Sequence, residues 1–327
     1  MKVTTIPGTA LRTSTICMGT GPIGSAVDRQ ASFALLDAYV DHGGTFLDSA
    51  SVYANWLPIE RSISEKTIGQ WLKLRGNRDR IVVGTKGGHP ELSTMHISRL
   101  SHADIVHDLD ASLANLQTDV IDLYWLHRDD PQRPVGEIVE TLNDQVRAGK
   151  VRSLGCSNWQ PARIRAAQEY AAQHGLQGFA ASQAMWSLAV PDRAALGDHT
   201  LAIMDDEFLR YHVQTGLAAI PYSSQANGYF QKLALGTADA IKPAQARVYG
   251  STENQERFKH IQKLCADTGL SVSQIVLGYL QSQPFTAIPI VGCRTPAQLE
   301  DSLAAGDVRL TPEQVQYLGS GLQHPGH

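Results

Sequence analysis

The stretch Gly44-Thr-Phe-Leu-Asp48-Ser-Ala-Ser-Val-Tyr53 is a short apolar run that ends at a carboxylate and reaches a phenol five residues later. Two further runs have the same form: Ile81-Val-Val-Gly-Thr-Lys86 and Val120-Ile-Asp-Leu-Tyr-Trp-Leu-His127. Runs of this length, rich in β-branched and aromatic residues, predict buried strands. Each strand ends at or just before an ionisable side chain. In α/β proteins the carboxyl ends of parallel strands form the edge where chemistry is done.

The same strand pattern recurs along the whole chain. Eight strands are predicted, at Thr15–Met18, Thr45–Leu47, Ile81–Thr85, Val120–Leu126, Val151–Gly155, Phe179–Ala184, Leu217–Pro221 and Ala287–Val291. Amphipathic segments between them predict helices, at Arg29–His42, Ser64–Leu74, His102–Leu116, Pro134–Ala148 and Pro161–His174.

Strand and helix therefore alternate, which is the pattern of a parallel sheet built through crossover helices. Eight such units in 327 residues predict a single (β/α)8 TIM-barrel domain over residues 1–327. Residues Val3–Ile6 and Leu11–Arg12 predict a β-hairpin that caps the bottom of the barrel. Two long stretches, Ser187–Met204 and Ser223–Ser251, are expected to be irregular loops on the C-terminal face. They are either functional lids or tolerated surface insertions.

A second fold remains open at this point. Gly19-Thr-Gly21-Pro-Ile-Gly24 follows a predicted strand and precedes a helix, and Asp48 ends the next strand. This spacing matches the dinucleotide fingerprint of a Rossmann domain. Pro22 opposes that interpretation, because it lies where free N–H groups should face a pyrophosphate. The barrel is favoured, and there the glycines let the first loop approach a ligand closely.

The amino-acid composition favours some classes of protein over others. Charged residues make up 18% of the chain, hydrophobic residues make up 43%, and the formal net charge is −4. These values suit a globular protein and give no reason to expect nucleic acid or an anionic membrane as a partner. No apolar stretch is long enough to span a bilayer and no signal peptide is recognised. The four cysteines have no paired spacing. We therefore expect a cytoplasmic protein without disulfides or a metal site.

The four residues at the strand ends suggest proton transfer to a carbonyl oxygen. A free tyrosine has a pKa of about 10 and is a poor proton donor at neutral pH. An ammonium such as Lys86 is expected to lower the pKa of Tyr53, with Asp48 holding that ammonium in place. His127 adds a second donor that orients a carbonyl. The arrangement suits protonation of an alkoxide as it forms during hydride reduction.

Each of these residues also has a purely structural interpretation. Asp48 can cap a helix, Lys86 can be a solvated turn residue, and Tyr53 and His127 can be core or rim residues. The joint occurrence at three consecutive strand ends favours a catalytic site.

At these residues the chain resembles the aldo-keto reductase superfamily. The first signature of that family is matched by Gly44, Asp48, Ser49, Ala50 and Tyr53. Lys86 and His127 occupy the other two catalytic positions in the right order. Similarity continues through Gly149-Lys-Val-Arg152, Gly155-Cys-Ser157-Asn158, Ser182-Gln183, Pro221-Tyr222-Ser223 and Gly292-Cys-Arg294.

The resemblance implies an NADPH-dependent carbonyl reductase with Tyr53 as general acid, tuned by Lys86 and Asp48. It implies that Ser157, Asn158 and Gln183 hold the nicotinamide carboxamide and that Tyr222 stacks on its ring. Ser223 would meet the pyrophosphate, and Arg294 would contact the adenosine 2′-phosphate, which suits a guanidinium. The remaining expected cofactor contacts are Gly19, Thr20, Gln298, Asp301 and Ser302.

Departures from the family pattern bear on the substrate. The chain inserts Ala54-Asn-Trp56-Leu-Pro-Ile-Glu60-Arg61 before Ser64-Glu65. Aromatic and charged residues near the strand ends favour a polar carbonyl such as an oxidised sugar, of the dehydro- or keto-glucose type. The expected substrate contacts are Trp56, His89, Trp125, Arg128 and Trp186; the alternative is that several of these tryptophans only pack the barrel wall.

A non-enzymatic alternative also stays open, because some members of the superfamily are nucleotide-binding regulatory subunits of membrane channels. Nothing in the sequence indicates a docking surface for such a partner. The expected partner is a small carbonyl substrate, and a homo-oligomer is left open.

Overall fold

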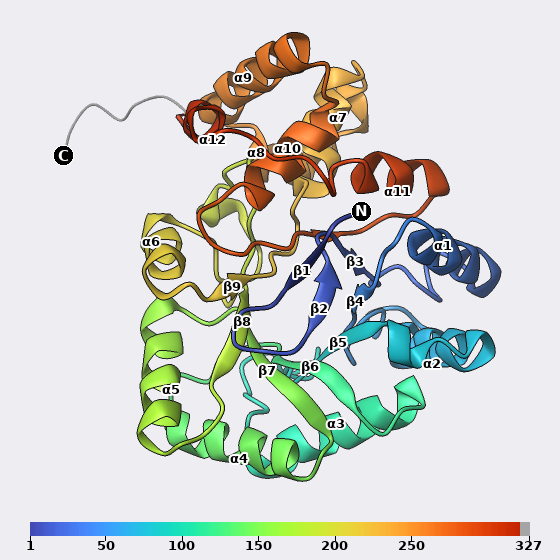
Figure 1. The fold of residues 1–327 in the computed structure, drawn as a ribbon, viewed down its shortest axis with the longest axis vertical. Coiled ribbons are helices and arrows are strands. Elements are labelled where there is room, and N and C mark those ends of the chain that lie inside the picture. The colour runs from blue at the N-terminus through green and yellow to red at the C-terminus, as the bar shows by residue number, and fades with distance from the viewer. Residues whose placement is uncertain (321–327) are drawn as a thin grey trace.

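The computed structural model describes residues 1–320 and shows a ring of parallel strands surrounded by helices (Figure 1). The sheet order is β10-β3-β4-β5-β6-β7-β8-β9, and all seven neighbouring pairs are parallel. The last gap is closed by a parallel bridge between Ala219 and Ala287. There the Ala219 amide donates to the Thr286 carbonyl and the Ile288 amide donates to the Ala219 carbonyl, each at 2.9 Å. The predicted (β/α)8 barrel is therefore confirmed, and the Rossmann alternative is wrong.

The eight barrel strands are β3 (Cys17–Gly19), β4 (Phe46–Asp48), β5 (Val82–Gly87), β6 (Ile121–Leu126), β7 (Val151–Ser157), β8 (Phe179–Gln183), β9 (Ala218–Ala219) and β10 (Ile290–Val291). Strands β9 and β10 are shorter than predicted. Pro221 and Pro289 flank them, and because proline has no N–H it can only accept in a ladder. Both do so, from the amides of Ile290 and Cys17 respectively.

Twelve helices lie outside this ring in the described residues: α1 (Arg29–Asp41), α2 (Ile63–Arg75), α3 (His102–Leu116), α4 (Val135–Arg147), α5 (Pro161–Gln173), α6 (Asp206–Thr215), α7 (Tyr229–Ala234), α8 (Pro243–Tyr249), α9 (Thr252–Thr268), α10 (Val272–Gln281), α11 (Pro296–Leu303) and α12 (Pro312–Gly319). Helices α1 to α6 follow one another around the barrel, while α7 to α10 and α12 gather at one end of the view (Figure 1). The five predicted helices agree with α1 to α5 to within one or two residues.

The N-terminal hairpin forms as predicted, from β1 (Val3–Thr5) and β2 (Arg12–Ser14) paired antiparallel. It crosses the front of the strand ring (Figure 1). Ile6 and Leu11 from its turn are buried in the same cluster as Phe46, Leu123 and Trp125, which point into the barrel. The hairpin thus closes the bottom of the barrel and leaves the carboxyl ends of the strands as the open face.

Of the two stretches predicted to be irregular loops, the first is irregular and the second contains helices. Residues 187–204 contain only one short 3₁₀ turn, Arg193–Ala195. The stretch Ser223–Ser251 instead contains α7 and α8, whose aromatic residues Tyr229, Phe230 and Tyr249 are buried. Burial of these rings supplies the packing that makes such short helices stable. That the whole chain is one domain stays a prediction, and residues 321–327 of its predicted span lie outside the described residues.

In residues 1–320, no helix combines the length and the apolar character needed to cross a bilayer.

Candidate active site

Asp48, Lys86 and Tyr53 meet at the carboxyl edge of two neighbouring strands. Asp48 is the last residue of β4, and Lys86 lies in β5 one residue before its end. Tyr53 follows five residues after β4, in a turn where its amide donates to the Ala50 carbonyl. Because β4 and β5 pair in parallel, their ends lie at one edge of the barrel and face the same space.

The Lys86 ammonium uses all three of its protons inside this site. It donates to Asp48 Oδ2 at 2.5 Å, to the Ser49 carbonyl at 2.7 Å and to the Tyr53 hydroxyl at 2.9 Å. The side chains of Lys86 and Asp48 are each only 1% exposed. A buried ammonium needs such a full set of acceptors, because an unpaired charge in this environment is strongly unfavourable. Lys86 is therefore held in one position, directed at the phenol.

The pKa of Tyr53 differs from the sequence-based expectation. Burial raises the pKa of Tyr53 above its ordinary value, and the opposing effect of the Lys86 charge does not overcome it. The prediction of a lowered tyrosine pKa is thus wrong for the net shift, although it is right about the direction of the lysine's influence. Burial acts to lower the pKa of Lys86, but Asp48 and Tyr53 outweigh it and the pKa rises. At neutral pH the site therefore holds a protonated phenol beside a charged ammonium.

His127 lies at the same edge, directly after β6, and faces the phenol. Its ring centroid is 6.2 Å from that of Tyr53 and 4.8 Å from that of His89. Burial, followed by the charges of Arg128 and Lys86, holds the pKa of His127 well below its usual range. The imidazole is neutral, and its buried Nδ1 contacts no partner in the described residues. A neutral imidazole still carries one N–H with which to orient a carbonyl.

The residues expected to hold a nicotinamide form a connected network beside these four. Gln183, the last residue of β8, donates to Asp48 Oδ1 at 3.0 Å. Ser157, the last residue of β7, donates to the Gln183 carbonyl at 3.0 Å. Asn158 follows in a left-handed conformation, with φ of 61°. Its side-chain oxygen accepts from the Tyr222 hydroxyl at 2.7 Å.

Gly19 is the last residue of β3 and pairs in register with Asp48, and Thr20 follows it. A Cβ on Gly19 would come within 2.7 Å of the Ile290 side chain, so glycine is needed for β3 to pack against β10. Thr20 is fully buried, and its hydroxyl donates to the Asp48 carbonyl at 3.0 Å. Thr20 therefore holds the backbone of Asp48, and its hydroxyl is already engaged by protein.

The residues expected at the far end of a cofactor lie around the start of α11. Arg294 is exposed, and its backbone amide donates to Gln298 Oε1 at 2.9 Å. Ser302 is buried and donates to Gln225 Oε1 at 3.4 Å, which joins α11 to the segment after β9. Asp301 accepts hydrogen bonds from Ser271 and Ser273 at the start of α10. Asp301 is therefore engaged with α10.

The expected substrate residues do not all lie at the open face of the barrel. His89 lies against His127, and Trp56 stands 59% exposed on the loop after β4. Trp186 instead packs against Tyr279 and Phe285, in the layer between barrel and helices.

Trp125 lies one residue before the end of β6 and pairs in register with Lys86 of β5, and its contact with a substrate stays a prediction. It is fully buried inside the barrel because side chains alternate along β6, so that Leu123 and Trp125 point inward. Its indole packs so close to Gly155 that a Cβ there would lie 2.3 Å from the ring.

Arg128 connects the site to the loop over residues 187–204. The sequence did not indicate this contact. Its guanidinium donates to the His127 carbonyl at 2.9 Å, to Asp198 at 3.0 Å and to Thr200 at 2.9 Å. The Ala202 amide adds a bond to the Asn158 side chain at 3.1 Å. No pattern marks Asp198 or Thr200 as partners of Arg128, because only the fold brings together residues 70 positions apart.

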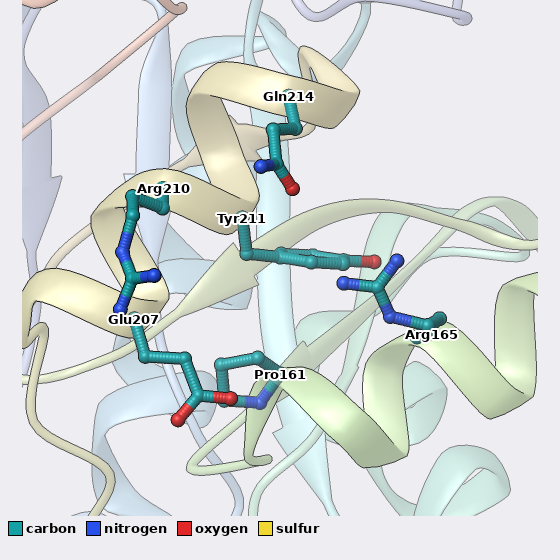
Figure 2. A pocket seen from close by; sticks show the side chains of 6 residues that line it. All are labelled: Pro161, Arg165, Glu207, Arg210, Tyr211 and Gln214. Carbon is teal, nitrogen blue, oxygen red and sulfur yellow. The ribbon is translucent and has the colours of Figure 1, made fainter.

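A separate pocket lies outside the barrel, between α5 and α6 (Figure 2). Pro161, Arg165, Glu207, Arg210, Tyr211 and Gln214 line it, and the Arg165 guanidinium lies over the Tyr211 ring at 5.3 Å. None of these residues comes from a strand end, so this pocket is distinct from the candidate active site.

The residues at the open face fit a phosphate-bearing dinucleotide. The backbone N–H groups of Ser223, Ser224 and Gln225 donate to no acceptor in residues 1–320. They follow directly after Tyr222, whose ring is partly buried beside Asn158. Three free amides are good donors for phosphate oxygens, and the exposed Arg294 adds a cation. The Tyr222 ring, the free amides and the guanidinium together suit a phosphate-bearing dinucleotide of the NAD(P)H type.

Comparison with known proteins agrees with this geometry. The family model described as aldo/keto reductase family matches residues 15–321. The chain is 29% identical to norsolorinic acid reductase stcV of Emericella nidulans, over 94% of this chain and 78% of that protein. It is 29% identical to the uncharacterized oxidoreductase YrpG of Bacillus subtilis, over 100% and 97%. It is also 29% identical to the NADP(+) aryl-alcohol dehydrogenase of Phanerodontia chrysosporium, over 95% and 83%. The chain, with its barrel and its paired lysine and tyrosine, belongs to the aldo/keto reductase family.

Proposed function

We propose that this protein reduces an aldehyde or ketone to an alcohol with a hydride from NADPH, and that Tyr53 gives the proton. The observation that carries the proposal is the contact of 2.9 Å between the Lys86 ammonium and the Tyr53 hydroxyl. Bound NADPH would supply the hydride. The family assignment and the relatives named as reductases and dehydrogenases support this reaction class.

The proton transfer follows from the charges at the site. The raised pKa keeps Tyr53 protonated at neutral pH, so the phenol is ready to donate. When an alkoxide forms beside it, the proton moves from the phenol to that oxygen. The Lys86 charge, held by Asp48, then stabilises the phenolate that remains. The neutral His127 orients the carbonyl with its single N–H.

The free amides at Ser223–Gln225, the Tyr222 ring and Asn158 would hold the dinucleotide. Arg294 favours NADPH over NADH, because a guanidinium pairs well with an additional phosphate. The name of one relative, the NADP(+) aryl-alcohol dehydrogenase, supports the same preference.

The proposed substrate is a polar carbonyl compound such as an oxidised sugar. His89 and Arg128 surround the catalytic edge with hydrogen-bonding groups, and both are mostly buried. An aryl carbonyl is a second candidate, favoured by the names of the aryl-alcohol dehydrogenase and norsolorinic acid reductase relatives. We further propose that the protein is cytoplasmic, because its four cysteines are all unpaired.

A regulatory nucleotide-binding subunit with little turnover is the alternative to an enzyme. Steady-state NADPH oxidation, followed at 340 nm with oxidised sugars and with aryl aldehydes, separates these functions. We expect turnover, with higher kcat/KM for the sugar carbonyls. Saturable NADPH binding with no carbonyl-dependent oxidation across the panel would indicate the regulatory role.

A further inference from the structure

Exposed apolar side chains gather on two loops at the mouth of the barrel. Within residues 1–320, eleven large hydrophobic side chains are exposed, and six of them lie on the loops after β4 and β5. We call these six the apolar rim: Trp56, Leu57, Ile59, Leu92, Met95 and Ile97. Scattered exposed hydrophobic residues are normal, but a concentration beside a site indicates binding.

The two loops follow Tyr53 and His89, and an ion pair joins them to each other. Trp56 follows Tyr53 by three residues, and Leu92 follows His89 by three. Arg61 of the first loop pairs with Glu91 of the second at 3.1 Å. Both loops therefore leave the barrel at its catalytic edge, and a substrate bound at Tyr53 and His127 lies beside the segments that carry the apolar rim.

The first loop is held in a defined shape. The Asn55 side chain accepts from the Ser62 amide at 2.8 Å and donates to the Ser51 carbonyl at 3.2 Å, which closes the base of the insertion. Ala54 is fully buried in a left-handed conformation, with φ of 67°. The insertion is thus built to present Trp56 outward from a closed base.

The second loop is fixed as well. Arg99 pairs with Asp108 at 2.6 Å and with Glu91 at 3.7 Å. Asp108 also accepts from the Gly88 amide at 2.9 Å. Arg99, Asp108 and Glu91 therefore form one charged network. This network fixes the loop that follows His89, and it includes Glu91, which pairs with Arg61 of the first loop. Apolar residues on a prearranged surface bind a ligand with less ordering cost than residues on a loose loop.

We propose that the substrate is amphiphilic: a hydroxylated carbonyl end enters the catalytic edge, and an apolar substituent lies on the apolar rim. This inference rests on the proposed reductase function and names the substrate class of the same site. The polar inner groups, His89, His127 and Tyr53, suit the hydroxylated carbonyl end, and the six rim side chains suit the apolar substituent. The alternative occupant of the rim is a second copy of the chain.

The test uses two aldehydes with the same reacting end, glyceraldehyde and its 3-O-phenyl ether, with NADPH. Wild type is expected to show a kcat/KM about tenfold higher for the phenyl ether. Trp56→Ser and Ile97→Ser are expected to reduce that ratio toward one. Leu74→Ser is the matched control, because Leu74 is at least as exposed as Trp56 and Ile97 but lies in the last turn of α2. This control should keep the ratio of the wild type.

The experiment distinguishes failure of this inference from failure of the proposed reductase function. Turnover of both aldehydes with no preference for the ether, or with a preference that survives both rim substitutions, would overturn this inference and leave the reductase function standing. No carbonyl-dependent oxidation of NADPH would overturn both. Light scattering decides about the second copy: a dimer that Trp56→Ser converts to a monomer would assign the rim to subunit contact and contradict our proposal.

Discussion

The side-chain amide of Gln183 donates to Asp48 Oδ1 at 3.0 Å, and so connects β8 to β4 across the barrel. The other carboxylate oxygen of Asp48 accepts from Lys86. Both oxygens are therefore oriented by protein, and the position of the lysine is set by residues far apart in the sequence. The catalytic geometry therefore depends on closure of the whole barrel.

Asp48→Asn is expected to lower the free energy of unfolding by about 3–5 kcal/mol, because it leaves the buried Lys86 charge without its carboxylate. Carbonyl reduction should be lost as well. Urea denaturation measures the first effect and NADPH oxidation the second. Asp110→Asn is the control: Asp110 pairs with Lys150 on the surface, where such pairs contribute less than about 1 kcal/mol. Equal destabilisation by both changes would contradict our description of the buried pair.

Stability should fall on acidification through His127. Burial and the neighbouring cations depress its pKa in the folded state, whereas the unfolded chain binds a proton at about pH 6.5. Its contribution is present above about pH 6.5 and is lost as the pH falls toward the folded pKa. His89 and His212, whose pKa values burial also lowers, add to the same loss. Thermal unfolding between pH 5 and 7.5 should show a smaller decline for His127→Gln than for wild type, and parallel curves would disprove this.

Gly155→Ala is expected to destabilise the barrel by about 1–3 kcal/mol, the usual cost of overpacking. The new Cβ would lie 2.3 Å from the Trp125 ring, which is itself fully buried. Gly197→Ala is the matched change, because a Cβ there meets no atom within 4 Å. Urea midpoints of the two variants should differ clearly. A Gly155→Ala protein as stable as wild type would mean that the ring has room to move.

Asp198→Ala should loosen the loop over residues 187–204. Asp198 accepts from Arg128 at 3.0 Å and also accepts from the Thr200 amide at 2.9 Å, so it orders the part of the loop that contacts Arg128. Limited proteolysis should cut this loop faster in the variant, and KM should rise. Asp192→Ala, which removes only the cap of the short turn at Arg193–Ala195, should be cut at the wild-type rate. Identical proteolysis of all three proteins would remove the anchoring role of Arg128.

Much of this architecture was predictable from the sequence because its signals are local. Strand-length apolar runs before Asp48, Lys86 and His127 placed three strand ends to within two residues, and parallel pairing then required those ends to share an edge. The Ile6 and Leu11 positions on either side of a tight turn likewise predicted the capping hairpin.

What escaped prediction depends on long-range contacts and on burial. The inward orientation of Trp125 follows from the register of β6, which a single run of apolar residues does not reveal. Helices α7 and α8 form because Tyr229 and Tyr249 pack together, with ring centroids 5.8 Å apart. The net rise in the Tyr53 pKa reflects desolvation, which can be judged only once the surrounding atoms are placed.

The most direct measurement of the central claim is the rate of NADPH oxidation by Tyr53→Phe at saturating carbonyl substrate, alongside the Kd of NADPH. The change removes the hydroxyl that lies 2.9 Å from Lys86 and leaves the ring in place. We predict that kcat falls by at least about 100-fold, the usual contribution of general acid catalysis, while the Kd stays within about threefold of wild type. A variant that retains wild-type kcat would show that the proton comes from another group.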